Sequence, residues 1–224
     1  MIQWLTSDVG VAKITKITGG LFEMFIIGLT GGIGTGKSTV AGILKEFGAA
    51  VVDADRVGHE IYHSHSIVWK EIVSRFGQQI LQPSGEIDRK KLGAIVFSDS
   101  NARATLNRIV HPRIYERIEQ KIEELAEHKI QVTVIEAAIL IEARWDSVTD
   151  EVWVVESPIT AVLTRLRENR GLSEEEATIR TSVQISDGER RRRADVVIDN
   201  SGDINMLRKN IESLWKKKRK ERFA

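Results

Sequence analysis

The chain has 224 residues, 42% of them hydrophobic and 29% charged, a composition typical of a globular protein and not of a collagen, a coiled-coil rod or a disordered chain. Lysine and arginine number 33 and aspartate and glutamate 32, so the net charge of +1 gives no overall field that would attract nucleic acid or membranes. The absence of cysteine excludes disulfides, thiolate nucleophiles and cysteine-bound zinc.

The first residues, 1–23, carry neither the basic start nor the apolar core of about 7–15 residues that define a signal peptide. No apolar run in the chain approaches the roughly 18 residues that indicate a membrane span. Together with the lack of cysteine, these features favour a cytoplasmic protein. Met24 stands directly before the first strand pattern, so we expect residues 1–23 to be a dispensable extension outside the fold.

The first predicted strand is the apolar run from Phe25 to Leu29, which leads into a glycine-rich turn. A helix should follow from Lys37 to Phe47, with Gly48 as its stop. Ala50 to Val52 predicts a second strand, which leads directly into the acidic segment Asp53–Asp55.

The next stretch, residues 56–128, is predicted to be mostly helical. Pro83–Gly85 has the composition of a turn, and Ser98–Ser100 that of a helix start. Pro112 should kink the chain or restart a helix, because proline removes a backbone donor and clashes with the preceding turn.

Strands and helices alternate through the rest of the chain. Three more strands are predicted at 132–135, 152–155 and 196–198. One helix is predicted at 158–170, a second begins at the capping box of Ser173 and Glu176, and a third begins at about residue 204. This alternation predicts an α/β fold with a parallel sheet, in which ligands bind beyond the carboxyl ends of the strands. Acidic residues stand at three of these ends: Asp53 with Asp55, Glu136, and Asp199.

Residues Gly31–Ser38 match the pattern G-x-x-x-x-G-K-[ST] at every fixed position, between a predicted strand and a predicted helix. Such a loop wraps phosphates with its backbone N–H groups and needs glycine for unusual dihedral angles and close approach. We expect Lys37 to reach the β- and γ-phosphates, the Ser38 hydroxyl to bind Mg²⁺, and Thr39 to approach the α-phosphate. The other residues expected to bind ATP are Gly32, Ile33, Gly34, Thr35 and Gly36.

The acidic residues at the strand ends can serve the same chemistry. Glu136 can hold Mg²⁺ through water, although a solvated acid is the alternative. If the chain stays extended after the second strand, Asp53 and Asp55 point to one side, and one of them could accept a proton from a substrate hydroxyl. The alternative for Asp55 is the N-cap of a helix beginning at Arg56.

The loop alone is shared by GTPase switches, motor ATPases and small-molecule kinases. The chain lacks the [NT]-K-x-D segment with which GTPases usually read guanine. A kinase must exclude water from the phosphates, and two helical segments could do so: an acceptor-binding insert at about 56–128 and a lid at about 165–193. Arginines of the lid could stabilise the phosphoryl group, but a solvated helix face is the alternative for most of them, and spacing alone does not select Arg165 and Arg170.

Further segments follow the loop in a fixed order. They are Val52–Asp55, Phe76-Gly77, Gly85–Arg89, Leu92, Val96-Phe97, His111-Pro112, Arg165-Leu166, Arg170, Gln184 and Ala194–Asn200. With these segments the chain resembles the dephospho-coenzyme A kinase family from about Phe25 to Ile211. The resemblance implies a P-loop kinase-type three-layer fold, with a five-stranded parallel sheet, a helical substrate-binding insert and a helical lid.

The resemblance also implies a reaction, the transfer of the ATP γ-phosphoryl group to the ribose 3′-hydroxyl of dephospho-coenzyme A. Asp55 would then face that hydroxyl, and Lys37 would act on the phosphates with Arg165 and Arg170 of the lid. The residues expected at the acceptor are Asp53, His59, Arg89, His111 and Glu142. The chain departs from the family at Ala138–Glu142, where the family often has Pro-Leu-Leu-Phe-Glu. Ala137-Ala138 and Glu142-Ala143 look more like the kinase part of the animal bifunctional coenzyme A synthase, although Arg144 stands where a glycine is commoner in that version.

We therefore expect a single kinase domain over residues 24–224, with its core at 24–55, 129–164 and 194–224. The alternatives are a kinase of another small acceptor, such as a nucleoside or nucleotide, and a nucleotide-dependent switch or ATPase. The basic run Lys216–Lys220 could touch nucleic acid or a membrane, but a solvated helix end is favoured. The sequence predicts no oligomeric state.

Overall fold

A computed structural model of the chain describes residues 23–171, 173–182 and 184–223. The chain divides into two compact units, a helical unit of Asp53–Lys121 and a sheet unit formed by the residues before and after it. Apart from Glu23, the expected extension lies outside the described residues. Among the described helices, none combines the length and the apolar character needed to cross a bilayer.

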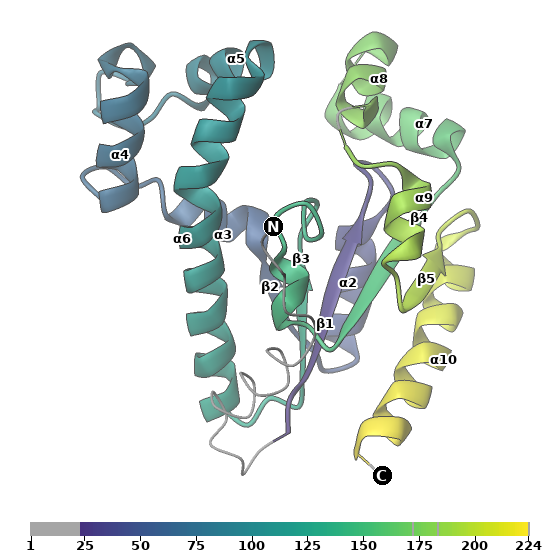
Figure 1. Ribbon diagram of the computed structural model, residues 1–224. Coiled ribbons are helices and arrows are strands. Elements are labelled where there is room, and N and C mark those ends of the chain that lie inside the picture. Colours follow the sequence, from purple (N-terminus) through teal and green to yellow (C-terminus); the bar gives the residue numbers. More distant parts are fainter. Residues whose placement is uncertain (1–22, 172, 183, 224) are drawn as a thin grey trace, which may run out of the picture. The chain divides into compact units, whose positions relative to one another are not determined.

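The sheet has five strands in the order β2-β3-β1-β4-β5 (Figure 1). Their bounds are β1 Phe25–Gly31, β2 Ala50–Asp53, β3 Val132–Glu136, β4 Glu151–Glu156 and β5 Val196–Asp199. β1 pairs in parallel with β3 and β4, and β4 pairs in parallel with β5. The predicted α/β fold is therefore confirmed, and each predicted strand is extended by one or two residues.

β1 is the central strand, and every one of its residues is buried. A parallel strand that is covered on both faces is apolar throughout, which explains the unbroken pattern of Phe25 to Leu29. Leu29 lies opposite Glu136 of β3 and Trp153 of β4. The carboxyl ends of β1 and β3 therefore lie side by side, and this juxtaposition positions the site described below.

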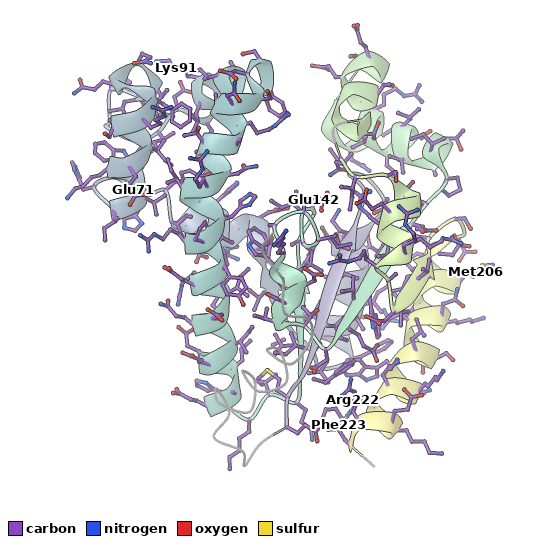
Figure 2. The ribbon with its side chains drawn as sticks, viewed as in Figure 1. Glu71, Lys91, Glu142, Met206, Arg222 and Phe223 are labelled. Atoms are coloured by element: carbon purple, nitrogen blue, oxygen red, sulfur yellow. The ribbon has the colours of Figure 1, made fainter. Side chains whose placement is uncertain are left out.

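Two helices of the sheet unit, α2 (Lys37–Glu46) and α10 (Ile204–Phe223), pack with the sheet in one hydrophobic core. Leu44 of α2 and Ile211 of α10 are fully buried in this core. Arg222 lies near the carboxyl end of α10 (Figure 2). Its guanidinium is 4.7 Å from the ring centroid of Phe25. In the basic run, Lys216 is exposed and pairs with Glu212 of the same helix, whereas Lys218 is largely buried and pairs with Glu151 of β4.

The predicted lid, at about 165–193, covers the second half of α7 (Ile159–Arg170) together with α8 (Glu174–Ser182) and α9 (Asp187–Arg192). α7 ends at Gly171, whose φ of 62° is the left-handed conformation that glycine adopts at low cost. The predicted capping box begins α8, because Ser173 Oγ accepts a hydrogen bond from Glu176 N and Glu176 Oε2 accepts one from Ser173 N. Both boundaries were predicted correctly from the sequence.

The helical unit contains α3 (Ala54–Glu60), α4 (Ile67–Phe76), the 3₁₀ turn η1 (Gln78–Ile80), α5 (Arg89–Ser98) and most of α6 (Ser100–Glu127), which ends in the sheet unit. The predicted turn closes with a hydrogen bond from Gly85 N to Gln82 O. Asp99 caps α6 by accepting hydrogen bonds from the backbone N–H groups of Asn101 and Ala102, so the predicted helix start is confirmed.

Two local predictions are wrong. The chain is not extended from Asp53 to Asp55, because α3 already begins at Ala54 and the Asp53 side chain is its N-cap, accepting a hydrogen bond from Arg56 N at 2.9 Å. Pro112 does not restart a helix, the second of the two outcomes expected for it, because it lies inside the 28-residue α6. Proline removes a single hydrogen bond, and the turns on both sides of it continue the helix.

Candidate active site

The phosphate-binding loop connects β1 to α2 at the carboxyl edge of the sheet (Figure 1). Gly34 and Gly36 have φ values of 77° and 99°, which lie in the left-handed region that favours glycine. Thr35 closes the turn inside the loop, since its N–H and its hydroxyl both donate to Gly32 O. α2 begins directly after the loop, and the first N–H groups of a helix form a favourable site for an anion.

Lys37 is the first residue of α2, and its side chain is buried. Its ammonium group donates hydrogen bonds to the carbonyl oxygens of Gly31 and Gly32, each at 3.0 Å. The positive charge is thus held at the first residues of the loop. A compact ammonium group in a poorly solvated position can neutralise the charge of phosphate oxygens more strongly than an exposed one.

Ser38 and Glu136 lie together at the edge of the sheet. The Ser38 hydroxyl donates a hydrogen bond of 2.7 Å to Glu136 Oε1, and both residues come from elements that the β1–β3 pairing brings side by side. A hydroxyl and a carboxylate are the hard oxygen donors that Mg²⁺ prefers, and Mg²⁺ usually keeps several waters in addition. The chemistry of these two residues therefore fits a magnesium site completed by water and phosphate. The described residues contain no cluster of three or more His, Cys, Asp or Glu suited to a metal.

Two polar side chains, those of Asn200 and Arg165, bind the backbone of the loop. The Asn200 side-chain amide donates to Thr35 O at 2.8 Å and is buried. Arg165 donates from Nη1 to Ser157 Oγ at 2.8 Å and to Gly34 O and Thr35 O at 3.4 Å, and from Nη2 to Asn200 O at 3.2 Å. Arg165, expected in the lid, therefore binds the loop itself. Its spacing to Arg170 did not indicate this contact.

We expect Gly36→Ala to damage this loop. A side chain at φ 99° is strained, and its Cβ would overlap the Asn200 amide nitrogen, so the free energy of unfolding should fall by about 1–3 kcal/mol and ATP binding should be lost. Gly42→Ala in α2 is the matched control. Nothing lies within 4 Å of its Cβ position, and this variant should gain about 0.5–1 kcal/mol. Urea denaturation measures the free energy of unfolding, and a nucleotide-binding assay measures the loss of ATP affinity. Equal stability and equal ATP affinity in the two variants would contradict this explanation.

A cavity of about 300 Å³ lies beside the loop, between it and the lid segment. Its lining comes from three regions: Gly32, Ile33 and Thr35 of the loop; Ser157, Ile159 and Val162 after β4; and Thr181, Gln184, Ile185, Ser186, Asp187 and Arg190 of the lid. Gln184 Oε1 accepts a hydrogen bond of 2.9 Å from the N–H of Ile33. The side-chain oxygen of this lid residue thus accepts a hydrogen bond from a loop N–H group that could also bind a phosphate oxygen.

The predicted residues of the sheet unit do not all lie in one place. The whole loop from Gly32 to Thr39, together with Glu136, forms one site, with Ser38 and Thr39 exposed. Glu142, expected at the acceptor, lies in the segment after β3 (Figure 2), where its Oε1 is 3.6 Å from Arg190 Nη2. Arg170 ends α7, and its side chain lies outside the described part of the chain.

The predicted residues of the helical unit are Asp53, Asp55, His59, Arg89 and His111. Asp55 lies exposed in the first turn of α3. Arg89 Nη2 donates to His59 O at 3.3 Å, so these two residues are brought together. The Arg89 guanidinium also lies 5.4 Å from the Tyr62 ring centroid, and burial raises the pKa of Tyr62, an effect that the Arg89 charge partly offsets.

Burial lowers the pKa of His111 below its ordinary value of 6.5. The unfolded chain then binds more protons than the folded one near that pH, so the free energy of unfolding should fall as the pH drops below about 6.5 and level off below the folded pKa. His111→Gln should reduce this fall. Chemical denaturation between pH 7.5 and 5 measures the effect, with His128→Gln at the exposed end of α6 as control. An unchanged pH dependence in His111→Gln would assign the fall to other groups.

Four contributors to the site were not among the sequence-predicted site residues: Ser157, Gln184, Arg190 and Asn200. Gln184 and Asn200 belong to segments that carried the family resemblance, so a signal for them existed. Ser157 had no signal, and Arg190 stood only among the lid arginines, most of which were expected to be solvated. Their role depends on burial that only the folded chain reveals.

Comparison with known proteins places the chain in a family. The model of the dephospho-CoA kinase family matches residues 25–206. The dephospho-CoA kinase of Moorella thermoacetica is 44% identical over 193 residues, which cover 86% of this chain and 91% of the relative. The crystal structure of a Thermus thermophilus protein has a TM-score of 0.74 at 29% identity and covers 87% of this chain and 98% of its own. For the dephospho-CoA kinase of Campylobacter jejuni the TM-score is 0.66 at 27% identity, and the match covers 88% of this chain and 98% of that protein. The chain belongs to the dephospho-CoA kinase family.

Proposed function

We propose that the protein transfers the γ-phosphoryl group of ATP to the ribose 3′-hydroxyl of dephospho-coenzyme A, the last step in making coenzyme A. The observation that supports this most directly is the phosphate-binding loop. It has a complete glycine pattern, the buried ammonium of Lys37, and the Ser38–Glu136 pair at the sheet edge, in a chain that belongs to the dephospho-CoA kinase family.

The loop and Lys37 form the ATP side of the reaction. The N–H groups from Gly32 to Thr39 bind the phosphates, and Lys37 neutralises charge on the terminal ones. Ser38, and Glu136 through water, would hold Mg²⁺, which supplies positive charge to the phosphates when it is bound. Arg165 keeps the loop in shape through its carbonyl contacts, and Arg170 belongs to the same lid helix.

The helical unit is proposed to bind the acceptor through Asp53, His59, Arg89 and His111, and Glu142 of the sheet unit is proposed as a further residue that contacts the acceptor. The 3′-hydroxyl oxygen attacks the γ-phosphorus, the bond to the ADP oxygen breaks, and Asp55 takes the hydroxyl proton. Phosphoryl transfer has a loose transition state, so positioning and charge neutralisation contribute more than the strength of the base. The partners are thus ATP and dephospho-coenzyme A, and we expect the reaction in the cytoplasm.

A mass-spectrometric assay with ATP, magnesium and dephospho-coenzyme A tests this proposal. We expect coenzyme A and ADP in equal amounts. ADP without coenzyme A would show that the loop works on another acceptor, and a panel of nucleosides and nucleotides would then identify it. ATP-dependent binding to a macromolecule without a phosphorylated product would instead indicate a switch, and no ADP from the folded protein would overturn the kinase proposal.

A further inference from the structure

Arg190 differs from its neighbours in the arginine run at the end of the lid. The side chains of Arg191 and Arg193 are 64% and 55% exposed, and Arg192 is exposed as well. Arg190, in the middle of α9, is 2% exposed. A run of this composition favours a solvated helix face, and for the other three arginines that interpretation agrees with the structure. A guanidinium group is buried only at a cost, unless anions or hydrogen-bond acceptors surround it.

The partners of Arg190 within the described residues do not satisfy its donors. Nη1 donates to Asp187 Oδ1 at 3.2 Å, and Nη2 lies 3.6 Å from Glu142 Oε1, beyond hydrogen-bond distance. Neither Nε nor Nη2 makes a hydrogen bond with any part of the chain that the structure describes. Asp187 and Glu142 therefore hold the guanidinium in place from α9 and from the segment after β3, while two of its nitrogens keep donor capacity for a further acceptor.

The position of Arg190 identifies the kind of acceptor. The residue lines the cavity of about 300 Å³ beside the phosphate-binding loop, and its Nη1 lies 3.7 Å from the position that a Cβ on Gly32 would occupy. Lys37 binds Gly32 O from within the loop. Two cations thus flank the same end of the loop, opposite the end where α2 begins. In a loop of this kind the helix start meets the inner phosphates and the lysine reaches the outer ones.

We propose that Arg190 binds the terminal phosphoryl group of ATP and thereby distinguishes ATP from ADP. Its planar guanidinium can give a phosphate two parallel charge-assisted hydrogen bonds, which a lysine cannot. Asp187 and Glu142 act as positioning residues that fix its orientation. The inference rests on ATP being the phosphoryl donor, as proposed above, and it adds a phosphate-contacting residue that neither the loop pattern nor the spacing of the lid arginines indicated.

The test is the affinity of the full chain for ATP and for ADP, measured by equilibrium binding in Arg190→Met and in the matched control Arg192→Met. Methionine keeps an apolar stem and removes the guanidinium. Losing charge-assisted bonds to the γ-phosphate should weaken ATP binding about 10- to 100-fold and leave ADP binding within about twofold. Arg192→Met should change neither affinity. The turnover number of Arg190→Met at saturating ATP should fall as well, because the same charge stabilises the transferring group.

Equal weakening of ATP and ADP in Arg190→Met would overturn the proposal and assign Arg190 a purely structural role, and so would no change in either. If Arg190→Met does not fold, Arg190→Lys decides: it keeps the charge and loses the planar fork, so it should weaken ATP binding selectively but less. Failure of the wild-type chain to bind ATP would instead refute the proposed function. If the wild-type chain is active but Arg190→Met weakens ATP and ADP binding equally, only the assignment of Arg190 is refuted and the proposed function stands.

Discussion

Lys37→Ala should lower the rate of phosphoryl transfer by at least about 10²–10³, the usual effect of removing one preorganised charge-stabilising donor from an active site. The ammonium group is buried against the loop, with two hydrogen bonds of 3.0 Å to Gly31 O and Gly32 O. It therefore loses little conformational freedom when phosphates bind. In a poorly solvated site its attraction for the developing charge exceeds what the same group would supply in water.

The measurement is the initial rate of coenzyme A formation, together with thermal unfolding of each variant. Lys45→Ala, which removes an exposed lysine from the last turn of the same helix, is the matched control and should retain activity within about twofold, as expected for a surface substitution. Lys37→Ala also leaves two loop carbonyls without their donor, so a lower melting temperature is expected. Activity of the folded Lys37→Ala variant within tenfold of wild type would show that Lys37 does not act on the phosphates.

The phosphate side of the site could be predicted because its determinants are local. A loop that must approach phosphates with its backbone needs glycine at fixed positions, and the residues before and after it define the strand and the helix that carry it. Glu136 could be predicted for a related reason, since parallel strands end at one edge of the sheet. The contact of 2.7 Å between Ser38 and Glu136 follows directly from this topology.

The remaining contacts depend on choices that the sequence pattern does not determine. Asp55 was the N-cap expected for a helix beginning at Arg56, but α3 begins two residues earlier, at Ala54, and its cap is Asp53. Arg190 could not be separated from the other arginines of its run, because its burial results from α9 packing beside the loop. Arg165 was expected to act on the phosphoryl group, and the sequence did not indicate its contacts with the carbonyls of Gly34 and Thr35.

The position of the N-cap bears on the proposed base. Because Asp53 supplies the oxygen that caps α3, the capping interpretation no longer competes for Asp55. Asp55 lies exposed in the first turn of that helix, two residues beyond the carboxyl end of β2. Ligands of an open parallel sheet bind beyond such ends. A carboxylate in this place can accept the proton of a hydroxyl brought there by the acceptor, the role that we propose for Asp55.

Asp55→Asn should therefore lower turnover by about 10²–10⁴, the usual contribution of a general base, while ATP affinity and the free energy of unfolding stay near wild type. Asparagine keeps the size of the side chain and removes its ability to take the proton, so a loss of turnover with retained ATP binding separates chemistry from binding. Glu60→Gln, which neutralises an exposed carboxylate at the other end of the same helix, is the control and should stay within about twofold. A rate of Asp55→Asn close to that of the control would exclude Asp55 as the base. Transfer would then depend on the loop, Lys37 and the lid alone, as a loose transition state permits.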